Sequence, residues 1–263
     1  MPRISWGDTG ARFYEIGVDR GVLYPPTGPG VAWNGLTAVN ESPSGGEERS
    51  FYLDGVMYLQ IPAAEEFEGT VEAFTYPDEF AQCDGSAQPF SGLFVTRQPR
   101  RPFGLSYRTY VGNDSGGMEN AYKIHIIYNA LAAPSNRGNA TVGDSMNPSN
   151  FSWNIKTKPA VVPGYKNTAH LVIRSDTATP RALSTLEDML YGTPDEAARL
   201  PTPAEILNLF EFDFGIIVTD NGNGTFTVTA PGDVITFLDA TTFQITAPSA
   251  VFIDADSYTI SSA

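Results

Sequence analysis

The sequence predicts a mainly β protein, a β-sandwich or barrel with one or two flanking helices. Apolar residues in the first 200 positions mostly alternate with period two, which is the spacing of half-buried strands. The 263 residues include 25 Gly and 20 Pro, which suits many short strands joined by turns. Only 17% of the residues are charged, fewer than helix-rich cytosolic enzymes usually carry, while 41% are hydrophobic and can build a core.

About seven segments have the alternation of strands, with turn residues between them. The clearest segment is 122–128, where Tyr122, Ile124, Ile126 and Tyr128 share one face and Lys123, His125 and Ile127 share the other. Similar alternation occurs in 70–76, 105–111, 151–155 and 169–174. The segment 52–58, with Asp54-Gly55 at its centre, has the pattern of a hairpin turn between two strands.

One helix is clearly indicated near residues 180–191. Thr179 can cap it, Pro180 suits its first position and Gly192 ends it. Leu183, Leu186 and Leu190 then line one face. A second start signal, Thr193-Pro194-Asp195-Glu196, resembles a capping box and predicts a short helix that ends by Pro201. We expect both helices to cover a face or edge of the sheet.

A composition break near Pro201 predicts two domains, 1–200 and 201–263. The first contains all 16 basic and 22 of the 30 acidic residues, a net charge of −6, and the second has eight acidic residues and no basic one. Thr225–Pro231 recurs as Thr242–Pro248 at an offset of 17 residues. Two such copies favour a small β-rich C-terminal domain rather than a solenoid.

Composition and charge also argue against several classes of protein. A net charge of −14 argues against a protein that holds nucleic acid through its phosphates. The most closely spaced basic residues are Arg97, Arg100 and Arg101. Pairing with an acidic neighbour explains this cluster at least as well as contact with phosphate does. The single cysteine, Cys83, is expected to be a buried, inert thiol. The first residues have no export signal, and no apolar run reaches the roughly 18 residues of a membrane span.

The sequence predicts no catalytic residue, no cofactor and no metal site. His125 and His170 lie in strand-like segments and are expected to be strand histidines at a sheet surface or subunit contact. No paired-His or Cys-x-x-Cys spacing is present, so a transition-metal site is not expected. Two carboxylates of the acidic stretch 65–79 could serve a glycosidase, although a solvated edge is favoured. Asp220–Gly224 could suggest calcium, but it lacks the closing Glu, and a glycine-rich turn explains it.

Five separated segments carry a resemblance to a known family. In chain order the segments are Phe13–Tyr24, Phe51–Gly55, Gly69–Phe80, Arg101–Tyr107 and Asn150–Ile155. Together they resemble the major tail protein, or tail tube protein, of long-tailed phages that infect actinobacteria, over roughly residues 10–200.

The resemblance implies a non-enzymatic virion protein without a cofactor. Six β-sandwich protomers would form a homohexameric ring, and stacked rings would form the tail tube around a tape-measure protein. Tail terminator and distal tail proteins would meet the tube, and DNA would pass through its lumen without specific binding. Assembly would take place in the host cytoplasm, with no membrane contact. The negative net charge agrees with this, because a basic lumen would retard DNA.

Three parts of the chain receive specific expectations within this family. The segment 40–49 is expected to be a long loop that becomes ordered at a ring–ring contact, because its composition cannot form a core. Lys156 and Lys158 are expected to face outward or to pair with acids of a neighbouring subunit. The C-terminal segment is expected on the outer surface of the tube, docked through Phe210, Phe212 and Phe214. The residues of the predicted inter-ring loop are Asn40, Glu41, Ser42, Pro43, Ser44, Gly45, Gly46, Glu47, Glu48 and Arg49.

Two other functions remain open from the sequence. A carbohydrate- or cell-surface-binding β-sandwich is the first, with Trp33, Tyr107 and Trp153 as a sugar platform, although core packing explains these aromatic residues equally well. A two-carboxylate glycosidase is the second.

Overall fold

The computed structural model describes residues 6–46, 48–62, 65–135, 137–139, 141 and 148–211, together with four short strands between residues 217 and 245. The protein is mainly β, as the sequence predicts, with one large antiparallel sheet and two α-helices. No helix among the described residues is long and apolar enough to cross a bilayer.

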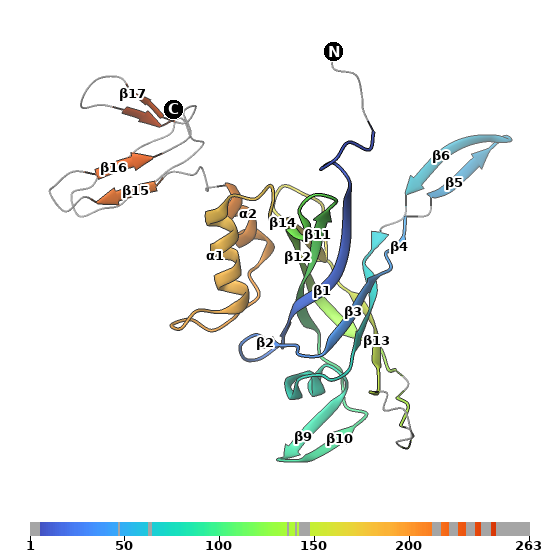
Figure 1. Cartoon of the computed structure of the whole chain (residues 1–263). Helices are drawn as coiled ribbons and strands as arrows, with labels where there is room; N and C mark the ends of the chain where they lie inside the picture. The colour runs from blue at the N-terminus through green and yellow to red at the C-terminus, as the bar shows by residue number, and fades with distance from the viewer. Residues whose placement is uncertain are drawn as a thin grey trace.

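The main sheet has eight strands, and its two ends approach each other. Because β3 lies close to β1 although the two are at opposite ends of the strand order, the sheet curls around its inner face (Figure 1). In spatial order the strands are β2 (Val31–Ala32), β1 (Phe13–Tyr24), β11 (Phe103–Asn113), β12 (Gly117–Ala132), β13 (Phe151–Thr157), β8 (Glu68–Ala73) and β3 (Leu36–Glu41). β14 (His170–Arg174) pairs with the middle of β12, residues 123–127, and β13 pairs with its last residues, 130–132.

The inner face of the curled sheet holds an aromatic core. Trp153 is fully buried and contacts the rings of Trp33 and Phe80 at centroid distances of 5.8 and 5.1 Å. Phe80 comes from the 3-10 helix η1 (Asp78–Gln82), which closes one end of this core (Figure 1). Cys83 follows it and is fully buried, as expected, and burial raises the pKa of its thiol to about 12.

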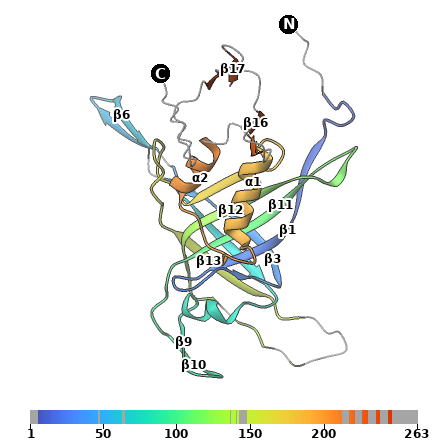
Figure 2. The ribbon, with the colours of Figure 1, turned by 90° about the vertical axis from the view of Figure 1, so that its left-hand side faces the viewer.

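Two helices cover the outer face of the sheet, α1 (Pro180–Tyr191) and α2 (Pro203–Glu211) (Figure 2). Leu186, Leu190 and Ile206 pack against Ile124 and Ile126 of β12. α1 has the predicted bounds: the Thr179 side chain accepts a hydrogen bond from the Ala182 amide, and Gly192 follows at a φ of 81°. Both faces of β12 are therefore covered, one by the helices and the other by the aromatic core.

The prediction of a second helix between Thr193 and Pro201 is wrong. Thr193 does accept hydrogen bonds from the Asp195 and Glu196 amides, but only a turn follows, since Pro201 leaves too little chain for a helix. The same signal recurs at Thr202-Pro203-Ala204-Glu205, where Glu205 Oε2 accepts from the Thr202 amide at 2.7 Å. This second capping box opens α2, so the outer core continues past the expected domain boundary at Pro201.

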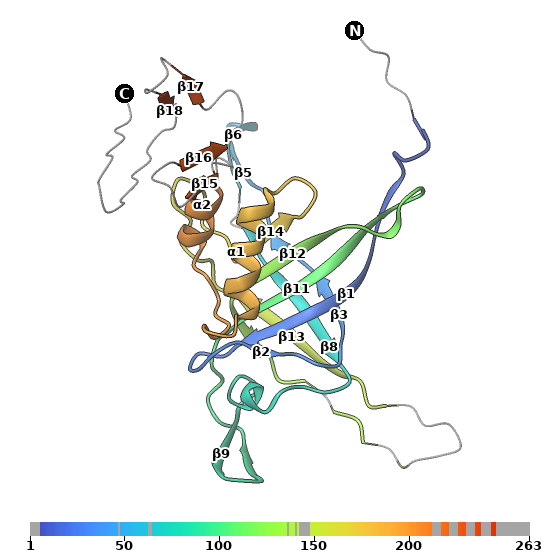
Figure 3. The same ribbon diagram turned by 60° about the vertical axis from the view of Figure 1, so that its left-hand side comes forward.

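Four short strands are described in the C-terminal segment. β15 (Ile217–Asp220) pairs with β16 (Phe226–Thr229), and β17 (Ile235–Phe237) with β18 (Phe243–Ile245), in two antiparallel hairpins (Figure 3). The two copies of the 17-residue repeat supply β16 and β18, which confirms that each copy contains strand. Phe212, Phe214 and 221–224 lie outside the described residues.

Candidate assembly surface

A two-stranded hairpin projects from the main sheet and exposes apolar side chains on both faces. β5 (Glu48–Leu53) pairs with β6 (Val56–Pro62), and the hairpin extends away from the body of the protein (Figure 1). Successive side chains of a strand point to opposite faces, so a run of consecutive exposed residues exposes both faces. The exposed large apolar side chains are Phe51, Tyr52, Leu53, Val56, Met57, Tyr58, Leu59 and Ile61. We call this hairpin, residues 48–62, the apolar arm.

The turn of the apolar arm is the one that its sequence predicts. Asp54 and Gly55 both have positive φ angles, 49° and 78°, as a tight hairpin turn of this kind requires. An isolated two-stranded hairpin is only marginally stable in water, and eight exposed apolar side chains would add an aggregation hazard. The arm therefore has the properties of a segment that becomes buried against a partner.

A second hairpin extends from the opposite end of the sheet. β9 (Ser86–Phe90) pairs with β10 (Leu93–Thr96), and both strands are exposed apart from the partly buried Ser86 (Figure 1). Phe90, Leu93, Phe94 and Val95 are the exposed apolar residues here. Apolar surface thus lies at two ends of the protein.

The segment predicted as an inter-ring loop forms the root of the apolar arm instead of a long loop. Asn40 and Glu41 end β3, while Ser44 and Gly45 form the short strand β4, which pairs with β7 (Glu65–Glu66). Arg49 belongs to β5. The charged composition of the segment hid these short pairings, since it gives no alternating pattern. Whether the segment contacts another ring stays a prediction.

The two histidines, expected at a sheet surface, meet inside the curled sheet together with Glu41. His125 of β12 is only 7% exposed, and its Nδ1 lies 3.1 Å from Glu41 Oε1 and 3.2 Å from His170 Nε2. His170 Nε2 lies 3.7 Å from the same Glu41 oxygen. We call these three residues the His–His–Glu cluster. The sequence does not predict this cluster, because its three residues come from three separate strands. One signal was present: Ile127 lies on the same face of β12 as His125, and an apolar residue there indicates that this face is buried.

Neighbouring side chains hold the His–His–Glu cluster in place. Tyr107 Oη donates to Glu41 Oε1 at 2.7 Å, and Thr109 Oγ1 lies 3.0 Å from Nε2 of His125. Hydrogen bonds from His125 and Tyr107 lower the pKa of Glu41 to about 2. Burial lowers the pKa of His170 to about 4, so its imidazole is neutral at pH 7.

The structure places the residues of the two alternative functions as follows. Trp33, Tyr107 and Trp153 are all buried, so they cannot form a sugar platform, and that reading of these residues is wrong. Among the acidic residues of 65–79, Glu68 binds Lys156 and Glu72 accepts a hydrogen bond from Asn150.

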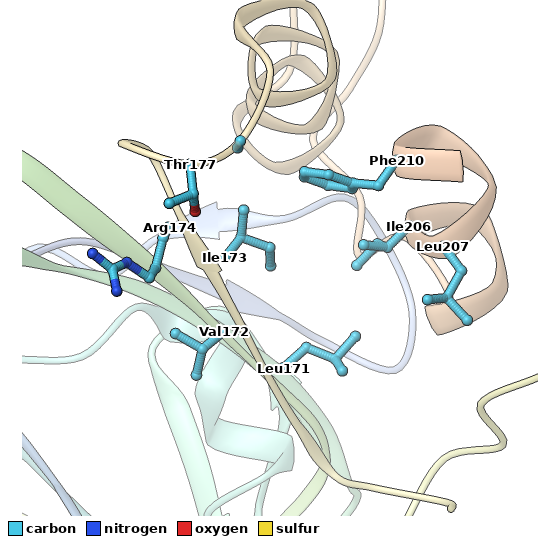
Figure 4. A pocket seen from close by; sticks show the side chains of 9 residues that line it. Leu171, Val172, Ile173, Arg174, Thr177, Ile206, Leu207 and Phe210 are labelled. Atoms are coloured by element: carbon cyan, nitrogen blue, oxygen red, sulfur yellow. The ribbon is translucent and has the colours of Figure 1, made fainter. Parts of the chain in front are cut away.

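An open apolar hollow lies between β14 and α2. Ile173 of β14 points toward Ile206 and Phe210 of α2 (Figure 4). Arg174 is the only charged side chain in its lining, and it is bound to Asp176 at 3.0 Å between Nε and Oδ1. The hollow therefore lacks paired groups for acid–base catalysis.

Comparisons with known proteins give no family assignment. No protein-family model and no curated protein match the chain. A solved structure of the anti-feeding prophage cap, its tube-terminating cap, is 9% identical and covers 66% of this chain and 97% of that one, with a TM-score of 0.30. The anti-feeding prophage baseplate is 10% identical, with 65% and 97% covered and a TM-score of 0.32.

A third solved structure, the PVC sheath–tube complex of an extracellular contractile injection system, is 12% identical, with 65% and 93% covered and a TM-score of 0.26. TM-scores this low do not establish a shared fold or a shared function.

Proposed function

We propose that this protein is a structural subunit of a phage tail tube, in which six copies form a ring and the rings stack. The apolar arm carries the proposal. Complete burial of an exposed Val, Leu, Ile, Phe or Met side chain contributes about 1.5–3 kcal/mol, and each partly exposed side chain of the arm would gain a fraction of this in an interface. In a closed ring every arm finds the same surface on the next copy, which buries all arms and leaves no free edge.

The segment resemblance to actinobacterial tail tube proteins supports this choice of assembly, because Phe51–Gly55 of that resemblance falls on the apolar arm. The tube would surround a tape-measure protein and end at tail terminator and distal tail proteins. A chain with a net charge of −14 would let DNA pass without specific binding. The protein would belong to the virion tail, assembled in the host cytoplasm, and would have no enzymatic role.

Charge pairing within the protomer is compatible with such a lumen. Lys156 binds Glu68 of the adjacent strand at 2.8 Å, so its charge is partly compensated inside one chain rather than by a neighbouring subunit. Whether Lys156 and Lys158 face away from the lumen is part of the proposal, and an assembled structure with either lysine lining the channel would contradict it.

Two exposed tyrosines provide a matched test. Tyr58 on the apolar arm is 75% exposed and Tyr165 outside it is 73% exposed, so both substitutions are expected to be tolerated by the fold. We expect wild-type protein to form rings or tubes as its concentration rises, measured by light scattering and electron microscopy. Tyr58→Asp should block this growth, because the charge cannot be buried, and Tyr165→Asp should not.

Two outcomes would contradict the proposal. One is a wild-type protein that stays monomeric at every concentration, even with tail initiation components added. The other is normal tube growth by the Tyr58→Asp variant.

A further inference from the structure

We propose that Glu41, His125 and His170 bind one zinc ion. These residues are far apart in the sequence and lie on β3, β12 and β14, yet each presents a donor atom to the same point inside the curled sheet. Two imidazole nitrogens and one carboxylate oxygen are a ligand set that zinc uses in proteins, with the fourth position left to water or another group.

The spacing of the three donor atoms fits a tetrahedral ion. Zinc bonds of about 2.0–2.1 Å at tetrahedral angles place ligand atoms about 3.3–3.4 Å apart. The three distances in the His–His–Glu cluster are 3.1, 3.2 and 3.7 Å, which bracket this value. An ion at their centre therefore needs only small movements of the side chains.

The protonation chemistry of the cluster also favours a cation. Glu41 Oε1, His125 Nδ1 and His170 Nε2 can each accept a hydrogen bond, and without an ion they must share protons between them. Zinc binding would displace the proton through which His125 Nδ1 is hydrogen-bonded to Glu41, and the remaining ring proton on Nε2 would be donated to Thr109 Oγ1. Zinc would then satisfy all three atoms at once.

Outer contacts orient the ligands as they do in metal sites. Thr109 holds the far nitrogen of His125, and the Tyr107 hydroxyl holds the ligating oxygen of Glu41. The ring of Tyr107 lies against His125 at a centroid distance of 4.6 Å, and Phe67 lies against His170 at 4.5 Å, which restricts both imidazoles. The side chain of Glu41 is 36% exposed and leaves a path from solvent.

Zinc would tie three strands together close to the apolar arm. Glu41 is the last residue of β3, and the arm root at Ser44–Gly45 follows shortly after it. Because no ordered site exists in the unfolded chain, bound zinc would stabilise the folded protein.

The test is a calorimetric titration of the chelator-treated, full-length protein with zinc. The zinc content is then measured by metal analysis after dialysis. We expect one zinc ion per chain and a raised thermal unfolding midpoint. His170→Gln and Glu41→Gln should each lower the affinity by more than the roughly 10–100-fold typical of a lost outer-shell partner. Glu72→Gln, a carboxylate on β8 outside the cluster, is the control and should bind as the wild type does.

Cobalt(II) gives a readout that does not depend on variants. Cobalt in the wild-type protein should show the intense visible bands of tetrahedral coordination, and these should be lost in His170→Gln. Circular dichroism shows whether each variant remains folded. Wild-type protein that binds no zinc stoichiometrically, equal affinity in wild type and His170→Gln, or the weak bands of octahedral cobalt would each overturn the proposal.

Discussion

Arg108 of β11 binds Asp19 of β1 through both carboxylate oxygens, at 2.9 Å from Nε to Oδ1 and 2.7 Å from Nη2 to Oδ2. Tyr110 donates to the same carboxylate at 2.6 Å, and the Arg108 guanidinium lies 4.6 Å from the centre of the Tyr122 ring. Fork-shaped pairs of this kind are among the stronger charged hydrogen bonds. The pair joins two neighbouring strands of the main sheet.

Replacing the cation of this pair should destabilise the fold. Arg108→Met leaves the partly buried Asp19 with Tyr110 as its remaining side-chain donor, and we expect a loss of about 1.5–3 kcal/mol in the free energy of unfolding, measured with urea. Arg174→Met is the control, because it removes the same fork from an exposed pair with Asp176. Equal losses in both variants would show that the position of the Arg108 pair has no special effect.

The same pair should contribute to acid sensitivity. Burial alone would raise the pKa of Asp19, but hydrogen bonds from Arg108 and Tyr110 outweigh it and lower this pKa below 3.8. A depressed folded-state pKa gives stability that is present above about pH 3.8 and is lost as the pH falls through the folded-state pKa. Asp19→Asn should therefore flatten stability against pH below about pH 4, measured by urea unfolding at several pH values. An unchanged slope would contradict this assignment.

A tyrosine links the main sheet to the end of α1. Tyr24 Oη donates to the Leu190 carbonyl at 2.9 Å and lies 3.0 Å from Ser106 Oγ, all in a buried position. Tyr24→Phe removes the donor and leaves a helix-end carbonyl without it, so we expect a loss of about 1 kcal/mol or slightly more in thermal or urea unfolding. Tyr14→Phe removes a hydroxyl from an exposed residue and should have little effect.

Much of this fold could be predicted from local patterns, because alternation, capping and turn residues act within a few positions. Thr179 and Gly192 correctly predict the two ends of α1, and Asp54-Gly55 correctly predicts the turn of the apolar arm. The sequence places α2 at the wrong one of two Thr-Pro-x-Glu signals, which stand nine residues apart. Pro201 stops a helix after the first signal, whereas Ile206 packs into the outer core after the second. The His–His–Glu cluster depends on the pairing of β12 with β14 and on the curl that brings β3 inward, which no local pattern contains.

Backbone strain in the arm turn should reduce assembly without touching any side-chain contact. Gly55 has a φ of 78° and open space around its Cα, so Gly55→Ala introduces only the cost of a left-handed backbone, about 1 kcal/mol. We expect a more mobile arm in hydrogen exchange and slower tube growth. Gly138→Ala is also placed in open space and has no positive φ, so it is the matched control. Tube growth at the wild-type rate in Gly55→Ala would mean that arm order does not limit assembly.

Removal of the C-terminal segment should leave assembly intact if the truncated protein keeps α2, which belongs to the outer core. Truncation after Leu200 would remove Ile206, which is buried against Leu186 and Leu190, and should destabilise the protein. Truncation after Glu211 keeps α2 and removes a segment with six acidic and no basic residues. Six such segments would repel one another in a narrow lumen, and outside the tube they can separate beyond the roughly 8 Å screening length of physiological salt.

The two truncated proteins are compared by urea unfolding and electron microscopy. We expect the 1–211 protein to fold and to form tubes of reduced outer diameter, and the 1–200 protein to be destabilised. A folded 1–211 protein that builds no tubes would place the C-terminal segment within the assembly machinery.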